Sequence, residues 1–132
     1  MDGFRLYSMD DGAQPPIEYH PSKAGDVYQV GTILKMDANA VTQADVDEAG
    51  DQLYFCAGEL TGEADKLVPV YRIRRSQVYC APWTVAATSI VPGDKVTLSA
   101  DRRGLTATKA KGLAEVIRMD GKAIGDVAYV RF

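Results

Sequence analysis

Apolar and polar residues alternate over short stretches of this chain, and residues that favour turns separate the stretches. Alternation with a period of two places every second side chain on one face, as in a half-buried strand. Many short strands divided by turn residues indicate an all-β fold. We therefore expect a small β-barrel or a compact sandwich of short antiparallel strands. The strand-like segments are 27–31, 32–36, 52–57, 67–74, 77–80, 84–90, 95–99, 105–108, 113–118 and 127–132.

The dipeptide Gly-Asp opens several of these segments. It occurs in AGDVYQVG from Ala24, AGDQLYFC from Ala49, PGDKVTLS from Pro92 and IGDVAYVR from Ile124. Glycine supplies the positive φ that many turns need, and an aspartate carboxylate accepts hydrogen bonds from nearby backbone N–H groups. Gly-Asp therefore predicts a turn from which a strand departs. The irregular spacing of the four copies argues against a solenoid.

Residues 38–51, ANAVTQADVDEAGD, contain the one helix-like patch. Thr42 could cap it, with Asp45 three residues later in a weakened capping box. The patch is short, so we expect a loop with a single helical turn. The fold then contains at most one short helix.

The first 23 residues differ in pattern from the rest. Pro15-Pro16 favours extended, polyproline-like backbone, which suits neither a helix interior nor a central strand. This segment nevertheless carries too many large apolar residues for a free tail. We expect residues 1–23 to form an extended N-terminal arm with one edge strand at 4–7, and residues 24–132 to form the β domain.

Two patterns near the C-terminus make local predictions. Asp120-Gly121 lies between apolar runs and predicts the tight turn of a β-hairpin. The nearly continuous apolar run 127–132 predicts a strand buried on both faces.

Composition and charge narrow the function. The 132 residues fit one domain, with 46% apolar and 25% charged residues. A net charge of -3 offers no strong attraction to nucleic acid or to an anionic membrane, so neither is expected as a partner. No apolar run approaches the ~18 residues of a membrane span. The N-terminus lacks the basic start and apolar stretch of a secretory signal, so we expect synthesis in the cytoplasm without export.

Candidate catalytic and metal-binding residues are few. Cys56 and Cys80 lie in apolar, strand-like contexts and are expected to be reduced core thiols. The single histidine, His20, has no nucleophile motif around it. The acidic residues at 45–50 do not match the ligand spacing of a calcium loop, and no glycine-rich phosphate-binding motif occurs. We therefore expect no catalytic residue, no metal, no cofactor and no enzyme activity.

Three residues are candidate partner contacts on chemical grounds. Arg72 and Arg74 belong to a basic cluster on a strand, and a second cluster lies at 102–111. Such clusters could serve an oligonucleotide-binding barrel, form a solvated face, or make salt bridges across a subunit interface. Trp83, the sole tryptophan, either packs in the core or contacts a partner.

Three stretches resemble small head decoration proteins of tailed phages and prophages. They are RLYSMDDGAQPPIEYHPSKAGDVYQVGTILKMD, LVPVYRI and VPGDKVTLSADRRGLTATKAKGLAEVIRMDGKAIGDVAYVRF. The features that carry the resemblance are the arm, the AGDVY entry, the GDKVTL strand and the terminal YVRF strand. The resemblance extends from residue 5 to residue 132, and none of these features is a chemical signature.

The resemblance implies a β-rich structural protein that binds the outer surface of an expanded capsid and stabilises the coat lattice. Its partner would be the major coat protein, its location the capsid exterior of the virion, and its assembly a homo-oligomer, with a trimer favoured. The arm residues that would contact the capsid are Pro15, Pro16, Ile17 and Tyr19. The alternative is a β-barrel binding module for single-stranded nucleic acid or a small ligand, in which Arg72 and Arg74 take part.

Overall fold

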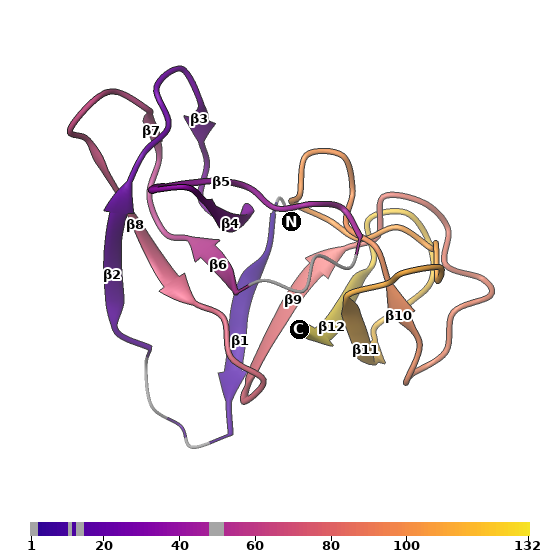
Figure 1. Ribbon diagram of the computed structural model, residues 1–132. Helices are drawn as coiled ribbons and strands as arrows, with labels where there is room; N and C mark the ends of the chain where they lie inside the picture. Colours follow the sequence, from indigo (N-terminus) through magenta and orange to yellow (C-terminus); the bar gives the residue numbers. More distant parts are fainter. Residues whose placement is uncertain (1–2, 11, 13–14, 48–51) are drawn as a thin grey trace.

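The computed structural model describes residues 3–10, 12, 15–47 and 52–132. In these residues the secondary structure consists of β-strands and contains no helix (Figure 1). The strands in chain order are β1 (Arg5–Met9), β2 (Ile17–Pro21), β3 (Val27–Tyr28), β4 (Ile33–Asp37), β5 (Ala40–Gln43), β6 (Leu53–Cys56), β7 (Leu60–Thr61), β8 (Leu67–Arg72), β9 (Gln77–Pro82), β10 (Lys95–Val96), β11 (Ala114–Met119) and β12 (Val127–Arg131).

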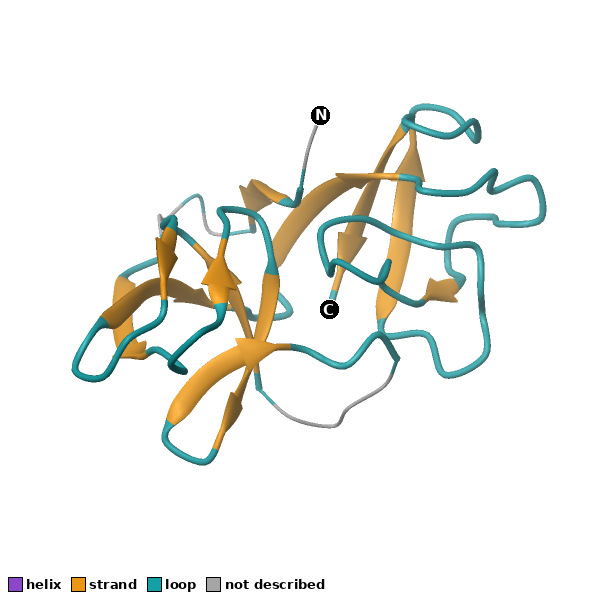
Figure 2. Ribbon diagram, turned by 90° about the horizontal axis from the view of Figure 1, so that it is seen from above, coloured by secondary structure: helices purple, strands orange, loops and turns teal. Residues whose placement is uncertain are grey.

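Ten of these strands form two antiparallel sheets, and β3 and β7 form a separate ribbon. Sheet A has the order β1-β9-β12-β11-β10, and sheet B has the order β2-β8-β6-β4-β5. Figure 2 shows the strands from above as two groups. Both sheets are open, although the edges of sheet B meet at one isolated bridge between Ser22 and Val41. The all-β prediction is confirmed, and the architecture is the sandwich rather than the closed barrel.

Two hydrophobic cores hold the strands together. The first core takes residues from both sheets, and the second lies on the other face of sheet B, with Tyr28 of the ribbon packed into it. On β6, Phe55 packs in the first core, whereas Tyr54 and Cys56 pack in the second. Successive side chains of a strand point to opposite faces, so β6 is buried on both. The Tyr28 hydroxyl donates a hydrogen bond of 2.6 Å to the Val41 carbonyl and so links the ribbon to sheet B beside the second core.

The loop between β10 and β11 of sheet A forms hydrogen bonds to the sheet B side of the molecule. The Ile33 N–H donates to the Arg102 carbonyl at 3.0 Å, and the Arg102 Nε donates to the Ala44 carbonyl at 2.6 Å. Ile33 belongs to sheet B, so these bonds fix one sheet against the other in addition to the shared core.

The N-terminal segment is not a free extension. The expected edge strand at 4–7 is found as β1, which pairs with β9. Farther on, β2 pairs along its whole length with β8, so the described parts of the arm form edge strands of both sheets. The physical reason is burial: Phe4 is 1% exposed in the first core, and its N–H donates to the Gly31 carbonyl.

The Gly-Asp turns match the sequence prediction at three of four positions. Gly25, Gly93 and Gly125 have φ of 90°, 99° and 89°. In each turn the aspartate N–H donates to the carbonyl three residues earlier, and β3, β10 or β12 begins directly after it. The Asp94 and Asp126 carboxylates each accept a backbone N–H at 3.0 Å, whereas that of Asp26 accepts the Thr42 hydroxyl at 2.9 Å. The fourth copy, at 50–51, lies outside the described residues.

Four local predictions were wrong. The strand-like segments 84–90 and 105–108 form no strand, and Leu105 takes part only in isolated bridges. The helix-like patch forms strand β5, because residues 40–43 pair with β4 and bury Val41 completely; residues 48–51 lie outside the described part of the chain. The β11–β12 hairpin exists, but its loop spans 120–126 and its positive φ is at Gly125, so Asp120-Gly121 is not a two-residue turn. Strand β12 buries only alternate residues, because one face of sheet A remains partly exposed.

Candidate interaction surface

Strand β2 presents two large apolar side chains to the solvent. Ile17 is 48% exposed and Tyr19 is 61% exposed. Both lie on the same face, because they are two residues apart on a strand. Their partners across the β2–β8 ladder, together with Leu67 (49% exposed), continue this face. We call this surface the β2–β8 stripe; it consists of Ile17, Tyr19, Pro21, Leu67 and Pro69.

The stripe runs toward a cavity that residues of β1 and Tyr71 of β8 help to line. Tyr71 lies opposite Ile17 in the ladder and also lines a cavity of about 330 Å³. Pro15 lines the same cavity, and Pro16 is exposed beside it. The cavity is lined by Leu6, Tyr7, Ser8, Met9, Gly12, Pro15 and Tyr71. Of the four arm residues singled out in the sequence, Ile17 and Tyr19 thus lie on the stripe, Pro15 lines the cavity and Pro16 is exposed between them in the chain.

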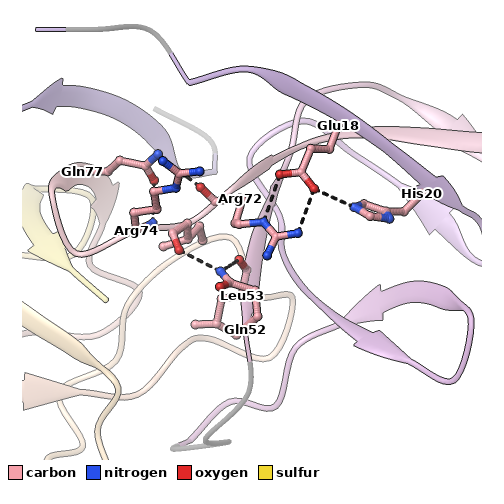
Figure 3. Close-up of polar contacts among 8 residues, drawn as sticks. Glu18, His20, Gln52, Leu53, Arg72, Arg74 and Gln77 are labelled. Atoms are coloured by element: carbon pink, nitrogen blue, oxygen red, sulfur yellow. Dashed lines mark hydrogen bonds and ion pairs between the residues drawn. The ribbon is translucent and has the colours of Figure 1, made fainter.

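A charged network on the opposite face fixes β2 in place (Figure 3). Arg72 donates from its Nε and its terminal amino group to the two carboxylate oxygens of Glu18, at 3.0 and 3.1 Å. The His20 Nε2 lies 3.1 Å from Glu18, and the His20 ring packs edge-on against Tyr54. The Arg72 guanidinium lies 5.7 Å from the centre of the Tyr54 ring.

The electrostatics of this network suit anchoring rather than proton transfer. The hydrogen bonds from Arg72 hold the pKa of Glu18 below its usual range against the opposing effect of burial, and the hydrogen bond from His20 adds to the lowering. Glu18 is therefore a carboxylate near neutral pH. The Glu18 carboxylate balances the charge of Arg72, so this ion pair helps to hold β2 against β8.

Arg74 lies in a different environment from Arg72. Its side chain is exposed, and its backbone N–H donates to the Oε1 of buried Gln77 at 3.0 Å. The same oxygen accepts the Tyr79 hydroxyl at 2.7 Å, while the Gln77 Nε2 donates to the Arg72 carbonyl at 3.2 Å. The β8–β9 connection is thus held by one buried amide. The structure does not bring Arg72 and Arg74 together as a single basic site.

Trp83 belongs to the core. It is 1% exposed, and its Nε1–H donates to the Gly121 carbonyl at 3.0 Å. Of the two interpretations that the sequence left open, core packing is the one found. The assignment of Trp83 as a partner contact was wrong, because its ring does not reach the surface.

A tyrosine–arginine cluster on the outer face of sheet A was not predicted from the sequence. The rings of Tyr7 and Tyr129 meet edge-on at 4.7 Å, and the Arg118 guanidinium lies 4.0 Å from the centre of the Tyr129 ring. The Tyr129 hydroxyl donates to Asp120 at 2.9 Å, and this bond raises the pKa of Tyr129. The three main residues come from β1, β11 and β12, so no local pattern reveals their proximity.

The thiols and the acidic side chains of the described residues form no cluster arranged for catalysis or metal binding. Cys56 and Cys80 are both buried and free, as expected, and burial raises the pKa of each thiol. Asp45, from the acidic segment weighed as a calcium loop, pairs with Lys35 at 3.1 Å. The described part of the chain contains no group of three or more His, Cys, Asp or Glu side chains placed to hold a metal. Nor does it contain a helix that is long and apolar enough to cross a membrane.

Comparison with known proteins places the chain in no group: no protein-family model, curated protein or solved structure matches it.

Proposed function

We propose that this chain is a structural, non-enzymatic protein that binds the outer surface of a phage or prophage head and stabilises its coat lattice. The β2–β8 stripe is its contact surface, and the major coat protein is its partner. The protein is made in the bacterial cytoplasm and resides on the capsid exterior.

The stripe is the observation that carries this proposal. Scattered apolar residues are normal on a surface, whereas adjacent exposed apolar residues such as those of the stripe support a binding role. Tyrosine at such a surface supplies a large contact area with little loss of conformational entropy. The Glu18–Arg72 pairing holds the strand that carries Ile17 and Tyr19, so the surface is ordered before a partner arrives.

A lattice supplies the affinity that one small stripe cannot. Each contact can be weak if one subunit bridges neighbouring coat subunits, because the second contact then forms at a high effective concentration. This gain from bridging, together with the sequence resemblance, favours a capsid over a single soluble partner.

The test is co-sedimentation of the purified chain with heads produced without it. We expect saturable binding, and at least a tenfold loss of affinity for Ile17→Asp and for Tyr19→Asp, because a charge cannot be buried in an apolar contact. Ile117→Asp is the matched control, since Ile117 is 39% exposed on β11 of sheet A. Failure of the wild-type chain to bind heads, or unchanged binding by both stripe variants, would overturn the proposal.

The alternative, a binding module for single-stranded nucleic acid, has weaker support. Arg72 is engaged by Glu18, and Arg74 is an exposed residue of the β8–β9 connection. This alternative predicts oligonucleotide binding that weakens with salt and is lost in Arg74→Ala.

A further inference from the structure

The two halves of the molecule carry opposite charge. Residues 17–47 and 52–73, whose strands build sheet B and the ribbon, contain eight Asp or Glu and four Lys or Arg. Residues 74–132 contain ten Lys or Arg and five Asp or Glu, and the described residues before β2, which include β1 of sheet A, add Arg5 and Asp10. The ion pairs of Lys35 and Arg72 stay within the first half, and those of Arg75 and Lys109 stay within the second. These pairs leave the difference in charge between the halves unchanged.

The acidic half ends in the β3–β7 ribbon. Val27 on β3 is 67% exposed and lies opposite Thr61 in the ribbon. Glu59 and Glu63 flank β7 and are exposed, as is Asp65 in the turn that follows. The ribbon end, as we use the term, consists of Val27, Glu59, Glu63 and Asp65. Lys23 and Lys66 lie nearby in the chain, as does Asp26, and leave an excess of negative charge.

The basic half ends in loops around β10. Val91 is 53% exposed, and its N–H is held by the Asp94 carboxylate. Lys109 lies 3.9 Å from the same carboxylate, while Lys95 and Lys111 are exposed. Gly112 lies too close to the Lys95 backbone to leave room for a side chain, so the segment before β11 runs directly against β10. The lysine edge, as we use the term, consists of Val91, Lys95, Lys109 and Lys111.

These two surfaces lie at opposite ends of the molecule, as the positions of the β3–β7 ribbon and β10 in Figure 1 show. We propose that the lysine edge of one copy binds the ribbon end of a second copy. Each surface combines an exposed valine with an excess of charge of one sign, so a contact buries apolar area and matches charge. The contact joins different patches on the two copies, so it is heterologous and leads to a ring or an open chain rather than a two-fold dimer.

Light scattering during size exclusion tests this head-to-tail contact. We expect a mass above the 14.3 kDa of one chain at low salt, falling toward that value at high salt. Between about 0.05 and 0.5 M salt, the screening length shrinks from roughly 14 to 4 Å, which weakens contacts between exposed charges. A single-chain mass at every concentration in low salt would overturn the proposal.

Reciprocal charge reversal identifies the surfaces. Lys109→Glu combined with Lys111→Glu makes both ends acidic, and Glu59→Lys combined with Glu63→Lys makes both ends basic. Each double variant should run as a single chain by itself. An equimolar mixture of the two should associate again, because every contact then joins opposite charges, and this recovery also shows that both variants are folded.

Two control variants test whether association depends on these two surfaces in particular. Arg5→Glu makes the same charge change per residue on the exposed edge strand β1 and should leave the mass unchanged. Ile17→Asp, in the stripe proposed for the coat protein, should also leave it unchanged, so the two proposals fail independently. Association that survives both double variants, or a mixture that stays monomeric, would contradict the head-to-tail contact.

Discussion

At Gly93 and Gly125, the absence of a side chain decides where a strand can begin. Both residues have φ near 90°, a conformation that L residues other than glycine adopt only at a cost. The aspartate that follows each glycine bonds back to the turn through its N–H and its carboxylate. Two adjacent residues thus contain most of the information for these turns, which is why they could be recognised in the sequence.

Gly125→Ala should destabilise the protein by about 1–2 kcal/mol, the cost of forcing an alanine into the left-handed region. Nothing lies within 4 Å of the added Cβ, so backbone strain is the whole effect. Urea unfolding measures it. Gly125→Asn should lose less, because asparagine tolerates this conformation better. Equal losses for alanine and asparagine would contradict a strain effect.

At the scale of one element, β2 carries different functions on its two faces. One face holds Ile17 and Tyr19 in the exposed stripe, and the other holds Glu18 and His20 in the charged network. The alternation of apolar and polar residues in this strand is visible in the sequence. Its pairing with β8 is not, because the partner strand lies about fifty residues away in the chain.

Glu18→Gln should lower the stability at pH 7 by about 0.5–1 kcal/mol, a modest value because both partners of the Arg72 pair are partly exposed. The folded-state pKa of Glu18 lies below its ordinary value of 4.5. The ionised carboxylate therefore stabilises the fold above pH 4.5, and this contribution is lost as the pH falls through the lower folded-state pKa.

Denaturant titrations at pH 7 and at about pH 3 measure this effect, and the difference between wild type and Glu18→Gln should shrink at the lower pH. Asp37→Asn serves as the control, since Asp37 is exposed and takes part in none of the ion pairs of the described residues. A constant difference across this pH range would argue against an ionic role for Glu18.

Across the whole molecule, the shared first core makes the two sheets depend on each other. Ile33 and Phe55 of sheet B pack in the same cluster as Tyr79 and Val130 of sheet A. Removing one sheet would expose the apolar face of the other to water, so the free energy of folding of each sheet depends on the presence of the other. The charge asymmetry between the halves is also a property of this scale, since it follows from which segments build which sheet.

Unfolding should therefore follow one cooperative transition, with Trp83 fluorescence and far-ultraviolet circular dichroism changing together. Phe55→Ala should shift both signals to lower denaturant by an equal amount, with a loss of about 3–5 kcal/mol. Tyr7→Ala, at a side chain 55% exposed, should cost far less. Two separated transitions would show that the sheets unfold independently.

The sequence by itself determined the all-β class, the Gly-Asp turns at 25, 93 and 125 and the burial of Cys56 and Cys80. These features depend on backbone conformations and residue patterns that act within a few positions of one another. Only the tertiary structure decided that the N-terminal segment completes both sheets, that Trp83 lies in the core and that Arg72 is bound by Glu18. Those outcomes depend on contacts between residues far apart in the chain, whose energies no local pattern contains.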